Sequence, residues 1–270
     1  MLITLSTVNP ILNTRSASAL TPTTSTSKTS STTTISAKTY NLNIAGKSDT
    51  SLQFQKMISL YPNGSTLKLP KGIYKFSNSV KLKDGMKLIA SSDVTIIGTG
   101  NNTLFSTGNS NSFQGINFQN CATAINVFLK KGLSVTNCKF TNNISYAAIN
   151  FYGSTSSSVT TSYFNDIRKY GILIDDNSSN IKIDKNNFTN NKVYGGYKYE
   201  QIGGHIYCLS GTKITVTNNI LRNSGGQGLI FAYNSSTGKG VTASTATNNQ
   251  SIGNGQEGIT VYGEIGRAHV

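Results

Sequence analysis

The sequence predicts an all-β protein, a right-handed parallel β-helix that a short helix closes at its N-terminal end. Short alternating runs of Ile, Val, Phe and Tyr recur along the chain, which is the pattern of strands. These runs return at intervals of about 23 residues, a period typical of a solenoid. Asn-rich turns separate them, as expected for tight corners between strands. A leucine-rich repeat is excluded because no fixed Leu consensus is present.

Two registers carry the repeat, and both should form columns inside the molecule. The central apolar residue of each four-residue strand should lie in one interior column, because equivalent residues of successive coils stack. The strands are Ala124–Val127, Ala148–Phe151, Gly171–Ile174, His205–Cys208, Gly228–Phe231 and Gly258–Val261, and the column is Ile125, Ile149, Ile172, Ile206, Leu229 and Ile259. The second register runs through Phe118, Phe140, Phe164, Phe188, Leu221 and Ile252.

Asparagine pairs follow the apolar anchors at the expected corners. Asn tolerates left-handed backbone and bonds its own main chain, so it suits such corners. Stacked Asn side chains can also bond from coil to coil. The pairs are Asn142–Asn143, Asn186–Asn187, Asn190–Asn191, Asn218–Asn219 and Asn248–Asn249.

Four segments make up the expected domain organisation. Residues 1–19 read as a truncated signal peptide that ends in a small-x-small pattern, and residues 20–40 as a Ser/Thr-rich linker. Residues 41–263 form the β-helix, which we expect to be truncated at its C-terminus. Residues 264–270 resemble the translation of a sequencing adapter. A secreted or cell-surface protein is therefore expected.

The net charge and the spacing of the cysteines limit the kinds of binding partner and metal site that we expect. The chain has 24 Lys and Arg against 10 Asp and Glu, a net charge of +14, which favours an anionic partner or simply a lysine-coated surface. The lysines are scattered, which argues against nucleic acid, and no segment is apolar for long enough to span a membrane. Cys121, Cys138 and Cys208 have no metal-ligand spacing; the first two could meet, but burial in the core is the favoured interpretation.

Three motifs resemble the pectate-lyase superfamily of β-helix proteins. Asp49–Ile58 is similar to the family's opening motif, Leu69–Tyr74 to its Leu-Pro-x-Gly-x-Tyr, and Gly98–Gly100 to its following Gly-x-Gly. The resemblance covers residues 45–263. It implies the fold but not the activity, because lyases, hydrolases, epimerases and phage tailspikes share it.

The opening motif also predicts the helical cap. Asp49 can N-cap a short helix, and Phe54, Met57, Ile58 and Tyr61 share one face of it. That face can cover the open end of the coil stack, whose strand edges and core would otherwise be exposed.

Alternation along the strands places a polar and aromatic stripe on the outside. We expect Tyr152, Asp175 and Tyr207 in line, with His205 at the edge and Asn150 nearby. An insertion between Phe188 and His205 adds Tyr194, Tyr197, Lys198, Tyr199 and Glu200, and inserted loops often hold the site. Tyr152, Tyr194, Tyr197, Lys198 and Asn150 are the expected sugar-binding residues. The insertion's tyrosines could instead simply order their own loop.

Two reaction types fit this set of residues. In β-elimination or C5-epimerisation of a uronate, His205, Tyr207 or Tyr199 would serve as base and acid, with Arg168 or Lys198 neutralising the carboxylate. These residues are similar in type to those of mannuronan C5-epimerases and alginate lyases. Hydrolysis needs two carboxylates, for which Asp175, Asp176 and Glu200 are candidates. The simpler interpretations are a turn at Asp175–Asn177 and a structural role for His205, although other coils have Gly or Ala at the latter position.

The expected function is action on an extracellular, acidic polysaccharide, as a lyase, a C5-epimerase or a glycoside hydrolase. The alternatives are a non-catalytic carbohydrate-binding adhesin and a phage tailspike fragment. No cofactor is expected; calcium would suit an acidic lyase site, but the sequence contains no dense Asp cluster for it.

Overall fold

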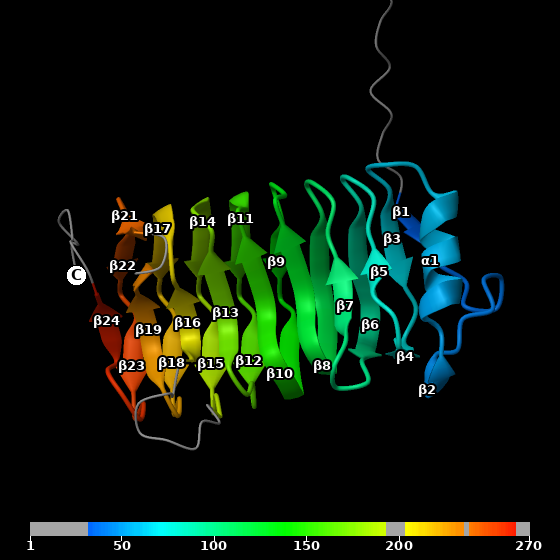
Figure 1. Ribbon diagram of the computed structural model, residues 1–270. Coiled ribbons are helices and arrows are strands. Elements are labelled where there is room, and N and C mark those ends of the chain that lie inside the picture. The colour runs from blue at the N-terminus through cyan, green and yellow to red at the C-terminus, as the bar shows by residue number, and fades with distance from the viewer. Residues whose placement is uncertain (1–31, 193–202, 235–237, 263–270) are drawn as a thin grey trace, which may run out of the picture.

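The computed structural model describes residues 32–192, 203–234 and 238–262. Within these ranges the chain forms 24 strands and one α-helix, α1 (Ser51–Leu60). Nearly all strand pairings are parallel and join one coil to the next. The coils stack from α1 at one end towards the C-terminal strands at the other (Figure 1). The predicted all-β parallel β-helix with one short capping helix is confirmed.

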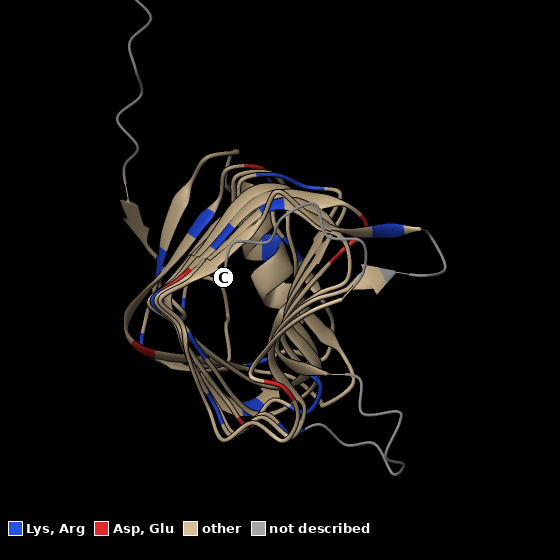
Figure 2. Ribbon diagram, turned by 90° about the vertical axis from the view of Figure 1, so that its left-hand side faces the viewer, with Lys and Arg blue, Asp and Glu red and all other residues tan. Residues whose placement is uncertain are grey.

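Each coil has three walls, seen end-on in Figure 2, which we name the first, second and third sheets. Several long strands bend around a corner and belong to two or three walls. The first sheet pairs the C-terminal parts of β8 and β10 with shorter strands. Its members are β5 (Val80–Lys81), β7 (Thr103–Ser106), β8 (Ser112–Phe128), β10 (Lys139–Tyr152), β13 (Tyr170–Asp175), β16 (Gly204–Cys208), β19 (Gln227–Phe231) and β24 (Ile259–Val261).

The second and third sheets complete the coil. The second contains β1 (Thr32–Thr34), β3 (Thr66–Leu69), β6 (Lys87–Ile97), the start of β8, β9 (Ser134–Thr136), β11 (Thr155–Thr160), β14 (Ser178–Asp184), β17 (Gly211–Thr217), β21 (Lys239–Thr242) and β22 (Thr245–Thr247). The third contains β2 (Ala45–Asp49), β4 (Gly72–Lys75), parts of β6, β8 and β10, β12 (Tyr163–Asn165), β15 (Asn187–Thr189), β18 (Ile220–Arg222) and β23 (Gln250–Ile252). A short hairpin joins β20 (Tyr233–Asn234) to β21 in antiparallel fashion.

The predicted interior column of the first sheet is confirmed residue by residue. Ile125 pairs with Ile149, Ile149 with Ile172, and the register continues through Ile206 and Leu229 to Ile259. The first five are fully buried, and Ile259 is partly buried against the same core. One continuous apolar cluster therefore runs along the stack, as the repeat period predicts.

The phenylalanine column lines the third sheet and stacks face to face. Ring centroids lie 5.0 Å apart for Phe118 and Phe140, 4.7 Å for Phe140 and Phe164, and 4.3 Å for Phe164 and Phe188. Leu221 extends the column. The expected last member was wrong by one residue: Leu221 pairs with Ser251, while Ile252 pairs with Arg222 and is exposed.

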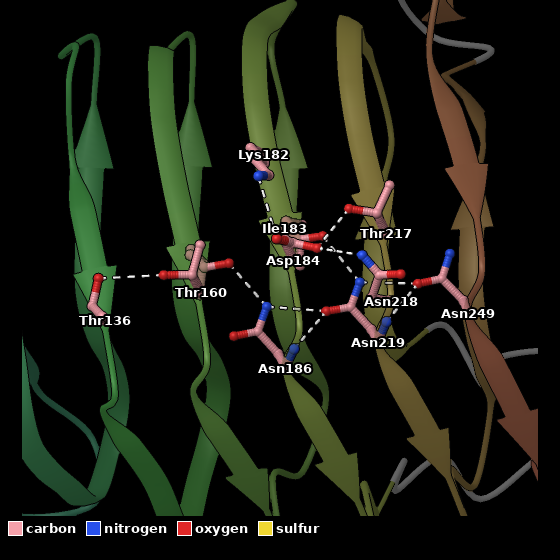
Figure 3. A network of polar contacts seen from close by, with 11 residues as sticks. Thr136, Thr160, Lys182, Ile183, Asp184, Asn186, Thr217, Asn218, Asn219 and Asn249 are labelled. Carbon is pink, nitrogen blue, oxygen red and sulfur yellow. Dashed lines mark hydrogen bonds and ion pairs between the residues drawn. The ribbon is translucent and has the colours of Figure 1, made fainter.

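Asparagines hold the corners, as predicted. Asn142, Asn143, Asn190, Asn218 and Asn248 have φ between 53° and 68°, the left-handed region that Asn tolerates. Other Asn side chains point inward and bond from coil to coil (Figure 3). Asn186 Nδ2 donates to Asn219 Oδ1 at 3.0 Å, and Asn219 Nδ2 donates to Asn249 Oδ1 at 3.0 Å.

The N-terminal cap is confirmed, with its start shifted by one residue. Phe54, Met57 and Ile58 of α1 are buried against the end of the stack, at the right of Figure 1. The N-cap position is Thr50 rather than Asp49, and it makes no side-chain cap bond. Asp49 still serves the helix start, because its Oδ1 accepts the Ser51 backbone N–H at 3.0 Å.

Two further expectations concern the N-terminal segment and the cysteines. Strand β1 and the buried Ile35 lie inside the segment that was expected to be a linker. All three cysteines are free and buried, and burial raises the pKa of each thiol, as expected of core residues. No helix among the described residues has the length and apolar character that crossing a membrane requires.

Candidate functional site

The outward side chains of the first sheet lie in two parallel columns. One column contains Tyr152 of β10, with Phe128 before it and Asp175 after it. Tyr207 lies in the other, beside Leu173. The second column reads Asn126, Asn150, Leu173, Tyr207, Ile230 and Thr260. The expected line of Tyr152, Asp175 and Tyr207 was therefore wrong by two residues at Tyr207: the two columns run side by side, and Asp175 borders Leu209 instead.

Phe128 and Tyr152 form an exposed aromatic pair. Their ring centroids are 5.2 Å apart with an interplanar angle of 11°. The two residues are 54% and 38% exposed, which is unusual for large aromatics that could have packed inward. The pair is fixed by the coil-to-coil register of β8 and β10, so it offers a rigid, flat apolar surface to solvent.

Three tyrosines, Tyr146 of β10, Tyr170 of β13 and Tyr207 of β16, cluster on the outer face of the same sheet. The Tyr146 and Tyr170 rings meet edge to face at 5.5 Å, and Tyr170 lies 5.2 Å from Tyr207. Tyr170 and Tyr207 belong to a second apolar cluster on the outside of the first sheet, together with Ala147, Leu173, Ile230 and Ala232. Lys169 lies over the rings of Tyr146 and Tyr170, with Nζ at 5.7 and 5.1 Å from their centroids.

Asp175 supplies the negative charge of this surface. Its Oδ1 accepts the Asp176 backbone N–H at 2.7 Å and the Ser210 hydroxyl at 3.1 Å. Burial, and then the charge of Asp175, raise the pKa of Tyr146. Burial raises the pKa of Tyr170, with smaller contributions from Tyr207, Tyr146 and Asp175. Both phenols therefore remain protonated at neutral pH and can donate hydrogen bonds.

The segment after Asp175 is a turn, as the simpler interpretation expected. Asp176 and Asn177 have φ of 50° and 55°, and the Ser178 hydroxyl donates to the Asp175 carbonyl at 2.7 Å. The turn explains why two acidic residues stand together in sequence there, because Asp and Asn tolerate left-handed backbone.

His205 does not lie at the outer edge of the stripe, so that expectation was wrong. Its side chain is 1% exposed and packs 5.7 Å from the Phe188 ring in the interior. Nε2–H donates to the Arg222 carbonyl at 2.9 Å. Burial lowers the pKa of the imidazole to about 4, so it is neutral at pH 7. Strand alternation fails here because the equivalent residues Ala124 and Ala148 also face the core.

The remaining predicted residues divide between the surface and the undescribed insertion. Arg168 is exposed next to Lys169, and its backbone N–H donates to the Ile144 carbonyl. Asn150 Nδ2 donates to Asn126 Oδ1 at 3.0 Å, while its own Oδ1 is buried with no hydrogen-bond partner among the described residues. The residues of the insertion, Tyr194, Tyr197, Lys198, Tyr199 and Glu200, lie outside the described residues.

Several residues of this surface were missed from the sequence. Phe128, Tyr146, Lys169 and Tyr170 were not among the expected binding or catalytic residues. A signal was present, because Tyr146 and Tyr170 precede neighbouring strands by nearly the same distance and should lie one coil apart.

No group of three His, Cys, Asp or Glu side chains in the described part of the chain could hold a metal ion. The expectation that the protein needs no cofactor, with calcium as the metal that would suit a lyase site, remains a prediction.

Comparison with known proteins adds a family and a set of similar folds. The family model for the right handed beta helix region matches residues 71–202. No curated protein matches the chain in sequence. Among solved structures, ORF18 of Geobacillus virus E2 is 11% identical with a TM-score of 0.63, covering 87% of this chain and 55% of its own.

Two other structures have names that state an activity. The tailspike protein gp49 of the Acinetobacter baumannii bacteriophage Fri1, a capsular polysaccharide depolymerase, is 10% identical with a TM-score of 0.54 over 86% of this chain and 57% of its own. An iota-carrageenase with bound iota-carrageenan fragments is 19% identical with a TM-score of 0.51, over 72% and 50%. This chain spans about half the length of these proteins. At such identities the likeness establishes the fold alone. The coil geometry and the match to this family model over residues 71–202 agree on the fold, a right-handed parallel β-helix.

Proposed function

We propose that the protein is secreted or displayed on a cell surface, and that the outer face of its first sheet binds an extracellular polysaccharide. The observation that carries this proposal is the exposed, parallel pair of Phe128 and Tyr152. Aromatic faces present a large apolar area at low entropic cost, and the apolar face of a sugar ring packs against such a surface. The pair is aligned with the stacking direction, so a sugar chain can run across successive coils.

The polar groups around the pair fit an acidic polymer. Lys169 brings positive charge to Tyr146 and Tyr170, the exposed Arg168 precedes it in the chain, and the whole chain carries a net charge of +14. Asn150 Oδ1 is a buried acceptor with no partner among the described residues, so a small movement of this side chain towards a sugar hydroxyl would gain a hydrogen bond. Two proteins of similar fold act on polysaccharides according to their names, which supports the proposal by analogy.

Binding is tested with the full chain and defined acidic polymers: polygalacturonate, alginate and iota-carrageenan. Titration calorimetry should find at least one ligand, and Tyr152→Ala should weaken its binding about tenfold or more. Tyr163→Ala is the matched control, because Tyr163 belongs to the third sheet. Equal binding by the wild type and Tyr152→Ala would reject the aromatic pair as the binding surface.

Catalysis is the second part of the proposal, favoured by the position of Asp175. Its carboxylate lies close enough to Tyr146 and Tyr170 to raise the pKa of both phenols. A carboxylate that accepts a proton and phenols that donate one are the groups that lyases and epimerases need. His205 is left out, because its ring lies in the interior. Glu200 of the insertion would be the second carboxylate for hydrolysis.

The products separate these reactions. An unsaturated uronate absorbing near 235 nm indicates elimination, new reducing ends without that absorbance indicate hydrolysis, and a changed uronate ratio by NMR indicates epimerisation. Asp175→Asn should abolish the product while leaving polymer binding within a few-fold of wild type. Binding without turnover of any of the three polymers would favour the adhesin alternative.

A further inference from the structure

A hollow lined by polar residues and glycines lies at the corner between the third and first sheets. It has a volume of about 730 Å³, within the range of small-ligand sites. Residues of four successive coils line it, because the corner repeats from coil to coil. We name it the corner hollow, and its amide side chains are Asn165, Asn190, Asn191 and Asn223.

The charged groups of the corner hollow neutralise each other. Lys192 Nζ lies 2.7 Å from Asp166 Oδ1, and these two are the charged residues among the described residues that line the hollow. An anionic ligand would have to compete with Asp166 for the lysine, and a metal ion with Lys192 for the carboxylate. The hollow therefore favours an uncharged ligand.

The rest of the lining suits a ligand that is rich in hydroxyl groups. Amide side chains offer both donors and acceptors, as sugar hydroxyls do. Gly225, Gly253 and Gly255 leave backbone atoms accessible on the same surface. Among the described residues of the lining none is aromatic, in contrast to the outer face of the first sheet.

Asn191 gives a second observation that points to a polar ligand. The residue is 2% exposed, and its Nδ2 is fixed by bonds to the Gly204 carbonyl at 2.6 Å and the Lys169 carbonyl at 3.2 Å. Its Oδ1 is buried with no hydrogen-bond partner among the described residues. Leaving a buried acceptor unsatisfied is unfavourable, and a bound hydroxyl would satisfy it.

We infer that the corner hollow binds a neutral sugar residue, as a second subsite separate from the aromatic pair. This inference rests on the proposed function for the choice of a carbohydrate, but it concerns a different surface. The bond from Asn191 to the Lys169 backbone links the hollow to the tyrosine cluster. A polymer that carries both charged and neutral residues could therefore occupy both sites.

The test follows backbone amide NMR signals of the full chain during titration with D-galactose, D-mannose, N-acetyl-D-glucosamine and D-galacturonate at millimolar concentrations. At least one neutral sugar should shift the signals of Gly225 and Gly253, and it should bind more tightly than galacturonate. No shift with any neutral sugar, or stronger binding of galacturonate at the hollow, would overturn the inference.

Two variants locate the binding. Asp166→Asn keeps the side-chain shape and tolerates the φ of 59°, and it should weaken binding about tenfold because a charge-assisted hydrogen bond is lost. Asn223→Gly removes an amide at a φ of 55° without backbone strain, and it should weaken binding several-fold. Asn142→Gly, at a φ of 56° outside the hollow, is the matched control and should bind as wild type.

The outcomes separate this inference from the proposed function. If Tyr152→Ala loses the acidic polymer but retains the neutral sugar in the hollow, both stand. If the polymer binds at the aromatic pair while Asp166→Asn and Asn223→Gly bind the neutral sugar as wild type does, only the inference fails. If the hollow binds its sugar but Tyr152→Ala does not affect the polymer, only the proposed function fails.

Discussion

The inner and outer sides of the first and third sheets follow opposite rules. Inside, successive coils place the same kind of residue in the same column, as Phe118, Phe140, Phe164 and Phe188 do. Outside, one column passes from Phe128 through Tyr152 to Asp175 within three coils. The interior must pack at constant spacing, so it repeats, whereas the exterior faces solvent and can differ in each coil. Residues that repeat from coil to coil therefore indicate the fold, and positions at which a coil differs from its neighbours indicate candidate functional residues.

The largest expected effect comes from breaking the interior column. Phe164→Ala removes a fully packed ring between two stacked neighbours, so it should lower the free energy of unfolding by about 3–5 kcal/mol. Urea unfolding followed by circular dichroism measures this. Tyr163→Ala, the outward neighbour, should cost clearly less; equal losses would contradict the distinction between the two sides.

A smaller loss of stability is expected when the hydrogen bonds between the interior Asn side chains are removed. Asn219 Oδ1 accepts the Asn186 N–H groups, and its Nδ2 donates to the Ile183 carbonyl and Asn249 (Figure 3). Asn219→Ala leaves several buried groups unpaired and should cost about 2–3 kcal/mol by the same urea measurement. Asn187→Ala on the outer surface should change stability by less than about 0.5 kcal/mol. If Asn219→Ala leaves the free energy of unfolding unchanged, water molecules replace the hydrogen bonds between these Asn side chains.

His205 makes the interior sensitive to pH. Its pKa is about 4 in the folded protein against the ordinary histidine value of 6.5, so the unfolded state binds more protons between these two pH values. Stability should therefore be unaffected above pH 6.5 and fall as the pH drops towards 4, by up to about 3 kcal/mol. His205→Gln retains a donor for the Arg222 carbonyl and should lose less stability between pH 7 and 5. Identical pH profiles of the two proteins would rule out the buried, neutral histidine.

The smallest effect on stability, together with a large effect on binding, is expected from a substitution on the outer face of the first sheet. Tyr152→Ala removes a half-exposed ring stacked on Phe128, so thermal unfolding should show a loss of about 1 kcal/mol or less. Binding of the polysaccharide should nevertheless fall about tenfold. A variant that loses both stability and binding in proportion would show that the pair is a structural element.

Most of the fold was predictable because its information is local and repeated. Each of the strands from Ala124–Val127 to Gly258–Val261 has an apolar residue at the same interior position. The interior column can therefore be predicted without knowing any distant contact. The candidate site was predictable only in part. Tyr152 and Asp175 followed from alternation, but the offset of Tyr207 by two residues depends on a register that one strand does not reveal. The burial of His205 could not be predicted from alternation, because two successive residues face the core at that bend.

The sequence by itself determined the coil repeat, the interior columns, the Asn corners and the helical cap, because each rests on the size and backbone preference of residues at a fixed period. Only the tertiary structure decided which outward side chains meet. The parallel pairing of Phe128 with Tyr152, the position of Lys169 over the ring of Tyr146 and the hollow around Asn191 each bring together residues from different coils. Such contacts depend on the exact stagger between coils and on where each corner turns, and these are set by the packing of the whole stack.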